Sequence, residues 1–231
     1  MKAVILAAGK GERLGAITAV RPKPMIEIAG KPVIQWNVEL CRQHGVDEIF
    51  INLHHLAEII IDHLGDGSRF GVAITYAQEA SLLGTAGGVK QFAQSLGDEP
   101  FLVVYGDNYS DYDLSALLAF HREKRADMSI ALFHLDDVRL SGVALLESDG
   151  RIAGFVEKPI QSPPPSHWVN AGIYVVSPTI LASIGEGEWD FGRQIIPHLI
   201  EAGRAVYGMV FPRKVIAIDT PALLEKSQQG L

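Results

Sequence analysis

The sequence predicts an α/β fold whose strands form a mostly parallel sheet within one domain, residues 1–231. Apolar runs of strand length alternate with segments of helical periodicity, which is the pattern of such a sheet. With 231 residues, 48% of them hydrophobic, the chain can bury a large core without external cross-links. No apolar run approaches the roughly 18 to 20 residues that cross a bilayer, so no membrane span is expected.

The alternation places each element in order along the chain. The expected strands are 2–8, 48–53, 72–77, 101–105, 129–135 and 169–176. The expected helices are 32–44, 56–64, 85–96, 114–124, 191–202 and 221–228. The fourth helix shows the clearest spacing, with Leu114, Leu117 and Leu118 on one face and a capping aspartate, Asp113, before it. The prolines within 162–166 cannot donate ladder hydrogen bonds, so a loop is expected there.

The net charge of −7 argues against a nucleic-acid partner, which would need a basic footprint. Residues 1–31 nevertheless hold six basic and two acidic side chains, and this cationic start suits a small phosphate ligand. Cys41 is the only cysteine, which excludes disulfides within the chain. The N-terminus reads as a buried strand rather than a secretory signal, so a cytoplasmic location without a membrane partner is expected. A homo-oligomer is compatible with the sequence, which does not indicate the oligomeric state.

The first expected strand runs directly into a glycine turn, LAAGKGERL at 6–14. Glycine lets backbone N–H groups approach phosphate oxygens, and an arginine adds a bidentate cationic fork. A dinucleotide fingerprint fails because Leu14 occupies the position of its third glycine, and a P-loop would need Gly-Lys-Ser/Thr. We therefore expect a phosphate cradle with nucleotide contacts from Leu6, Ala7, Ala8, Gly9, Gly11 and Arg13.

A second motif, RPKPM at 21–25, places Lys23 between two prolines that stiffen the backbone around it. At this spacing, LAAGKGERL and RPKPMIEIAGKPVI resemble the sugar-1-phosphate nucleotidylyltransferase family, in the short single-domain form like mannose- and heptose-1-phosphate guanylyltransferases. The resemblance implies a Rossmann-like three-layer sandwich of the nucleotide-diphospho-sugar transferase type, with a mixed, mostly parallel central sheet. It also implies a nucleotide-binding half over 1–110 and a sugar-binding half over 111–231.

The reaction that the resemblance implies joins a nucleoside monophosphate from an NTP to a sugar 1-phosphate and releases pyrophosphate, with Mg²⁺ as cofactor. Such chemistry depends mainly on positioning and charge neutralisation. The expected catalytic residues are Arg13, Lys23, Asp107 and Lys158. Two other classes remain as alternatives: a non-catalytic nucleotide-sugar sensor, and a dinucleotide-dependent oxidoreductase, against which Leu14 counts.

The strand expected at 101–105 ends in Gly-Asp-Asn, at the carboxyl end where α/β sheets bind ligands. The resemblance assigns Asp107 to Mg²⁺, which prefers carboxylate and phosphate oxygens, and Asn108 to the sugar phosphate. A turn or helix-cap role is the alternative for Asp107. Near the end of the chain Ala217 replaces a metal-binding aspartate of some relatives, and the run IDTP suggests Asp219 as the second Mg²⁺ ligand. Alternatively, Asp219 simply starts the last helix.

The nucleobase is expected to lie near LGTAGG at 83–88, where the family backs the base with the glycine at Gly84 and opens a helix at Thr85. Glu79 lies where the family reads the base edge, and Gln78 is a second candidate. A carboxylate can accept two adjacent hydrogen bonds from guanine but only one from uracil or thymine. This favours GTP, and the resemblance to guanylyltransferases implies mannose or heptose 1-phosphate as its partner. The alternative is thymidylyl or uridylyl transfer to glucose-type or amino-sugar 1-phosphates.

The segment GFVEKP at 154–159 matches a family motif in which the acid, Glu157, holds sugar hydroxyls and Lys158 binds the sugar phosphate. Neighbours on a regular strand face opposite sides, so the strand must bend or end here for both to serve one site. Gly142 and Asn170 resemble further sugar contacts. Each of these two alone could equally be a turn glycine or a strand-end amide.

Overall fold

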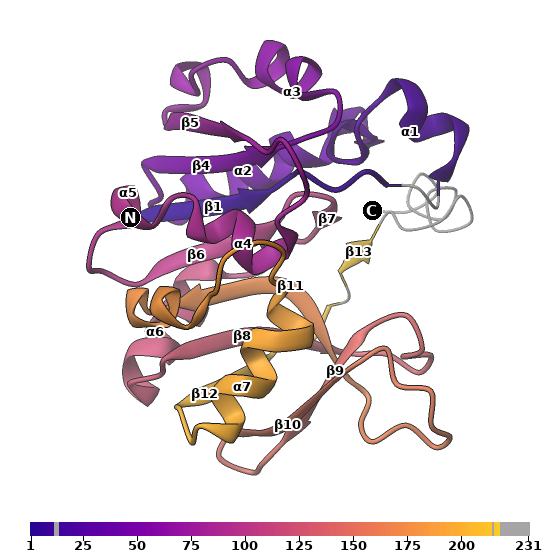
Figure 1. The fold of residues 1–231 in the computed structure, drawn as a ribbon, viewed down its shortest axis with the longest axis vertical. Helices are drawn as coiled ribbons and strands as arrows, with labels where there is room; N and C mark the ends of the chain where they lie inside the picture. The colour runs from indigo at the N-terminus through magenta and orange to yellow at the C-terminus, as the bar shows by residue number, and fades with distance from the viewer. Residues whose placement is uncertain (12–13, 214, 218–231) are drawn as a thin grey trace. The chain divides into compact units, whose positions relative to one another are not determined.

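The computed structural model describes residues 1–11, 14–213 and 215–217, which belong to two compact units (Figure 1). The first unit contains Met1–Leu82, Val104–Asp111 and, of the described residues, 215–217. The second contains Leu83–Val103 and Tyr112–Lys214. Across these described ranges, no helix has the length and apolar character that a membrane span requires.

The first unit is built on parallel strands. They are β1 (Lys2–Leu6), β4 (Glu48–Leu53), β5 (Ala73–Gln78) and the last two residues of β6 (Phe101–Tyr105). Lys2 lies opposite Glu48, which in turn lies opposite Ala73. Just beyond the strand ends, Gly106 N donates to Leu6 O over 2.9 Å. All residues of β4 except the first are buried, as expected for a strand covered on both faces.

Helices and short turns complete the first unit. The helical segments are α1 (Ala16–Val20), η2 (Lys23–Met25), α2 (Val33–Gln43), α3 (Ala57–Leu64) and η3 (Ser68–Phe70). Two small antiparallel pairs are β2 (Glu27–Ile28) with β3 (Lys31–Pro32), and β7 (Asn108–Tyr109) with β13 (Ile216–Ala217). α2 forms because Ile34, Val38 and Cys41, spaced by four and three residues, share one buried face.

The second unit is built mainly on antiparallel strands. The strands that lie wholly within this unit are β8 (Met128–His134), β9 (Gly142–Leu146), β10 (Ile152–Glu157), β11 (Trp168–Val176) and β12 (Val206–Val210). β9 pairs with β10 and β11, and β8 pairs with β11, all antiparallel, whereas β12 runs parallel to β8. The register of β11 against β8 shifts between Asn170 and Tyr174, which marks a bulge.

The helical segments of the second unit are α4 (Gly84–Lys90), α5 (Ala93–Leu96), α6 (Leu114–Lys124), η4 (Pro178–Ser183), the π-helix η5 (Phe191–Ile195) and α7 (Ile196–Glu201). α6 packs on β8, β11 and β12, while α7 packs on β10 and β12 (Figure 1). Asp113 accepts a hydrogen bond from Ala116 N over 2.9 Å, which confirms the predicted cap.

The predicted elements agree with the structure within two residues at their ends, with one exception among the described residues. The helix expected at 85–96 is divided into α4 and α5. The chain turns at the buried Phe92, whose N–H donates to Val89 O, three residues back, over 3.0 Å. Periodicity does not predict β9, β10 or β12, each of which contains a glycine that weakens the strand pattern; the end of a strand at Glu157 is expected only from the GFVEKP motif. The helix expected at 221–228 lies outside the described residues.

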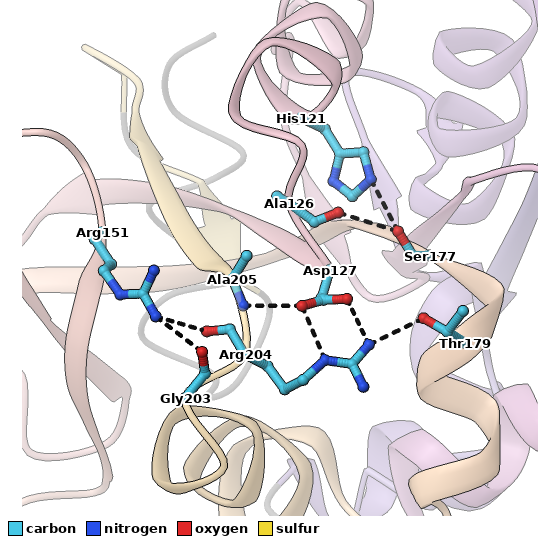
Figure 2. A network of polar contacts seen from close by, with 9 residues as sticks. All are labelled: His121, Ala126, Asp127, Arg151, Ser177, Thr179, Gly203, Arg204 and Ala205. Atoms are coloured by element: carbon cyan, nitrogen blue, oxygen red, sulfur yellow. Dashed lines mark hydrogen bonds and ion pairs between the residues drawn. The ribbon is translucent and has the colours of Figure 1, made fainter.

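A polar network fastens the chain just before β8 to the chain just before β12 (Figure 2). Arg204 donates from Nε to Asp127 Oδ2 over 2.9 Å and from Nη2 to Oδ1 of the same carboxylate. Ala205 N donates to Asp127 Oδ2 over 2.9 Å. These hydrogen bonds hold the pKa of Asp127 below its usual value, and the bond from the Arg204 side chain contributes most.

His121 lies buried in the same network (Figure 2). The Ser177 hydroxyl donates to Ala126 O over 3.1 Å, so its oxygen accepts from His121 Nε2 over 3.3 Å. His121 Nδ1 then accepts from Ser129 Oγ over 3.1 Å. The neutral imidazole is therefore satisfied at both nitrogens. Burial lowers the pKa of His121 to about 4.

The edge of β12 that faces away from β8 is covered by the turn that precedes β10. Gly208 N donates to Gly150 O over 2.8 Å, and Arg151 forms an antiparallel bridge with Tyr207. The Arg151 guanidinium also lies 5.9 Å from the centre of the Tyr207 ring. The same guanidinium donates to the carbonyl of Gly203 over 3.1 Å (Figure 2).

Candidate functional site

The glycine turn follows β1 directly, as the sequence predicts. Leu6 is the last residue of the strand, and Ala7 and Ala8 after it are buried. Gly11 has φ +64, and a Cβ there would stand 2.8 Å from Thr18 Cγ2, so the fold itself requires a glycine.

Gly9 differs from Gly11, although the two glycines are only two residues apart. No described atom lies within 4 Å of the place where a Cβ at Gly9 would stand, and its φ is not positive. Packing within the described chain therefore does not explain this glycine, whereas a closely approaching ligand would. Arg13, expected beside the turn, lies outside the described residues.

Lys23 and Asp107 form an ion pair within the first unit. Lys23 belongs to the turn η2, with Pro22 before it and Pro24 after it, and only 7% of the lysine is exposed. Asp107 follows Gly106, where a Cβ would stand 2.8 Å from Leu6 O, so only glycine fits beside the end of β1. The structure thus brings together a buried cation and the strand-end carboxylate that the sequence singled out.

Asn108 follows Asp107 and begins β7, where it lies opposite Ala217 of β13. Asp219, two residues beyond Ala217, lies outside the described residues. Within the described ranges, no group of three or more His, Cys, Asp and Glu side chains could hold a metal ion.

The base-reading candidates lie at the end of β5. Gln78 is the last residue of this strand and is exposed, while Glu79 is buried, with 4% of its surface exposed. Glu79 Oε1 accepts a hydrogen bond from Asn52 Nδ2 over 2.8 Å, and Asn52 Oδ1 accepts from Ala7 N over 2.9 Å. Sequence reasoning missed Asn52. The sequence does hold a signal for this residue, because Asn52 interrupts the apolar run of β4 and a buried amide needs hydrogen-bond partners.

Gly84 and Thr85 are held by another segment of the second unit. Gly84 has φ +72, and a Cβ there would stand 2.4 Å from Trp189 O. Thr85 Oγ1 donates to Asp190 Oδ2 over 2.9 Å and accepts from Phe191 N over 2.8 Å. The first-turn donors Ala86 N and Gly87 N both bond to Trp189 O, so packing engages the donors that were expected to favour an anion.

Glu157 and Lys158 lie at the point where β10 ends. β10 ends at Glu157, and Lys158 adopts a left-handed conformation with φ 52. Lys158 N donates to Ser141 O over 3.0 Å, and its Nζ lies 3.8 Å from Glu157 Oε1. The expectation that the strand bends or ends here is confirmed, since β10 ends at Glu157.

The Glu157 carboxylate packs against two glycines. A Cβ at Gly142 would stand 2.6 Å from Glu157 Oε2, and one at Gly192 would stand 2.7 Å from the same atom. Burial raises the pKa of Glu157 above its usual value, and the charge of Asp190 adds to the rise. Gly142 therefore makes room for the acid that the sequence assigned to the sugar.

Asn170 stabilises the bulge in β11. Its Nδ2 donates to Tyr174 Oη over 2.7 Å, and its Oδ1 accepts from Gly172 N over 2.9 Å. An amide has a second N–H and further lone pairs, so contact with a sugar hydroxyl would add to this structural role.

Comparison with known proteins agrees with the motifs. Residues 2–215 match the nucleotidyl transferase family, and the chain belongs to that family. It is 40% identical over 223 residues to a UTP–glucose-1-phosphate uridylyltransferase of Synechocystis sp., covering 90% of this chain and 58% of the relative. It is 34% identical over 210 residues to a mannose-1-phosphate guanylyltransferase of Mycobacterium tuberculosis, with the same coverages of 90% and 58%. The chain thus spans less than two thirds of the length of either relative.

The fold also matches solved structures. A UDP-glucose pyrophosphorylase in complex with UDP-glucose superposes with a TM-score of 0.84 at 21% identity, covering 99% of this chain and 97% of the other. This likeness confirms the expected Rossmann-like fold with a mixed sheet and flanking helices.

Proposed function

We propose that this chain transfers a nucleoside monophosphate from an NTP to a sugar 1-phosphate and releases pyrophosphate. One observation carries the proposal: Gly106 N donates a hydrogen bond to Leu6 O. This bond joins the end of β1, which leads to the glycine turn, to the end of β6, which leads to Asp107. Asp107 is in turn paired with the buried Lys23. The glycine turn, the buried lysine and the carboxylate thus belong to one edge of a parallel sheet, which supports a phosphate-binding role for them.

In the proposed reaction, an oxygen of the sugar phosphate attacks the α-phosphorus in line. A bond forms between these two atoms as the bond to the bridging oxygen of pyrophosphate breaks, without a covalent enzyme intermediate. The glycine turn, Arg13 and Lys23 would hold the triphosphate and neutralise its charge. Glu157 would accept hydrogen bonds from sugar hydroxyls, and Lys158 would bind the sugar phosphate.

Mg²⁺ is part of this proposal. Asp107 offers a hard oxygen donor whose side chain is 29% exposed, and Mg²⁺ commonly takes one or two protein carboxylates beside substrate phosphates. The donor chemistry therefore fits, with Asp219 as the expected second ligand. The ion would supply charge neutralisation at the phosphates.

A matrix of NTPs against sugar 1-phosphates, with Mg²⁺ present and pyrophosphate as the readout, tests the proposal. The named relatives act on different bases and sugars, so GTP with mannose or heptose 1-phosphate, and UTP or dTTP with glucose-type or amino-sugar 1-phosphates, all belong in the matrix. If no pair of substrates releases pyrophosphate and the chain nevertheless binds a nucleotide sugar, the protein is instead a sensor.

Two further predictions have their own tests. Cell fractionation tests the predicted cytoplasmic location, and a single cooperative unfolding transition would support the predicted single domain.

A further inference from the structure

His55 lies in the turn between β4 and α3, within the first unit. It is half-buried, and Leu56 after it has φ 54 and ψ 40, a left-handed conformation that residues other than glycine rarely adopt. His55 Nε2 lies 3.1 Å from the carbonyl oxygen of Thr18. A carbonyl oxygen can only accept, so Nε2 carries a proton and donates it. The histidine thus ties the end of β4 to α1.

The Thr18 carbonyl needs a donor from outside its own helix. α1 is five residues long, and the last carbonyls of a helix have no partner within it. An α-helical bond to Thr18 O would have to come from Pro22, four residues further along, and proline has no N–H. The proline that stiffens the chain before Lys23 therefore leaves this carbonyl without a helical bond. The imidazole of His55 supplies a donor in its place.

Thr18 in turn holds the glycine turn. Its side-chain hydroxyl shares one proton between Gly11 O, at 3.0 Å, and Gly15 O, at 3.2 Å, and only 3% of the residue is exposed. A backbone carbonyl directed at a phosphate would repel it, whereas the bond from Thr18 directs the Gly11 carbonyl toward α1. With this carbonyl occupied, the backbone of the turn is preorganised for an anion.

We propose that His55 is a positioning residue for the triphosphate, an inference that rests on the proposed function. His55 holds α1, α1 carries Thr18, and Thr18 fixes the carbonyl of Gly11. A turn that is already ordered loses less conformational freedom when an NTP binds, so more of the interaction energy appears as affinity. His55 acts through Thr18 and needs no contact of its own with substrate.

The first test removes the donor of His55 and then restores it. His55→Leu keeps an apolar side chain of moderate size without an N–H, whereas His55→Gln keeps a terminal N–H. We expect His55→Leu to weaken NTP binding by about three- to tenfold, the range that loss of one hydrogen bond produces, and His55→Gln to recover affinity. Calorimetry without sugar measures the binding.

The loss should be the same for each NTP that the wild type binds, because His55 acts on the turn that holds the phosphates and not on the base. An unchanged affinity in His55→Leu, or a loss that differs between bases, would overturn the inference.

A double-mutant cycle tests whether His55 acts through Thr18. Thr18→Val removes the hydroxyl at similar volume, which releases the Gly11 carbonyl. His55→Leu should then change the KM for NTP by less than about twofold further, because the link to the turn is already broken. The KM for the sugar 1-phosphate, measured at saturating NTP, should stay unchanged in all variants. Full and additive losses in both backgrounds would contradict the inference.

His63→Leu is the matched control. His63 is another half-buried histidine of the first unit, on α3, and its Nε2 bonds to Gln35 Oε1 over 2.9 Å. This variant should lower the melting temperature and leave NTP affinity unchanged. A weaker affinity in His63→Leu would show that loss of stability alone weakens binding, against the inference.

The wild-type chain separates failure of the inference from failure of the proposed function. If it neither binds an NTP nor releases pyrophosphate, the proposed function fails and the inference fails with it. If it does both, and His55→Leu binds NTP as tightly as the wild type, the inference fails alone.

Discussion

The two units present their candidate residues in different ways. In the first unit, Ala7, Glu79 and Asp107 each follow the end of a parallel strand. Lys23 forms an ion pair with Asp107, so the two charges neutralise each other. In the second unit, Glu157 ends an antiparallel strand and its carboxylate is packed against Gly142 and Gly192, where burial raises its pKa. A strand end needs only the sheet to place a side chain, whereas a packed carboxylate also needs neighbours of the right size. Changes to the charged side chains of the first unit should therefore affect mainly activity, and changes to the packed carboxylate of the second should affect activity and stability together.

Lys23→Met should show the largest effect on turnover. A positioned cation at developing negative charge contributes about 10²–10³ in kcat, and methionine keeps the volume without the charge. Steady-state kinetics with the best substrate pair would measure it. Lys31→Met is the control, since Lys31 pairs with Glu39 at 2.5 Å in a surface ion pair. A raised KM with unchanged kcat in Lys23→Met would show that the lysine only binds substrate.

Glu157→Gln should lower kcat/KM by about tenfold or more and yet stabilise the fold, which sharpens the contrast between the units. Burial raises the pKa of Glu157 in the folded chain, so the ionised carboxylate weakens folding at neutral pH. Glutamine removes that charge. Chemical denaturation at pH 7 should give a higher free energy of unfolding for the variant, and the difference should shrink as the pH falls through the folded pKa. Lower stability at pH 7 would argue that Glu157 is stabilised as an anion.

Gly9→Ala and Gly11→Ala separate ligand contact from folding within one turn. Gly9→Ala should leave the melting temperature unchanged and weaken NTP binding by roughly tenfold, because its Cβ meets no described atom within 4 Å. Gly11→Ala should cost about 1–2 kcal/mol of stability, since its Cβ would stand 2.8 Å from Thr18 Cγ2 at φ +64. Thermal melting and calorimetry measure both. Equal losses of stability in the two variants would remove the distinction.

His121 should affect stability only in acid. Its pKa falls from 6.5 to about 4 on burial, so between these values the unfolded chain takes up a proton that the folded chain does not. As the pH falls from 6.5 to about 4, the free energy of unfolding should decrease by up to roughly 3 kcal/mol. In His121→Gln this slope should disappear, while the loss below about pH 4 from Asp127, whose pKa is also lowered, should remain. Equal slopes for the two proteins would mean that His121 is protonated in the fold.

The sequence predicts the first unit well because its signals are local. The apolar runs of β1 and β6 are continuous, and the glycine turn and Lys23 belong to short motifs in which each residue restrains the next. The irregularity at Glu157 is also predictable, because two neighbouring side chains can share a side only if the strand bends or ends there.

Other features depend on register, which periodicity does not give. A polar residue at position 52 indicates a buried amide, but its partners Ala7 and Glu79 are decided by how three strands align. Likewise, Gly142 is recognisable as a glycine, yet the carboxylate that it accommodates comes from the strand paired with it. The role of Thr85 in holding the backbone of Phe191 depends on a contact of the same long-range kind.

The covered edge of β12 has a consequence for self-association. An open strand edge offers unpaired N–H and C=O groups on which a second chain can add as a further strand, a common route to aggregation. Here the bond from Gly208 to Gly150 and the bridge between Tyr207 and Arg151 occupy that edge from within the same chain. A homo-oligomer of this protein would accordingly have to use side-chain surfaces rather than strand addition at β12.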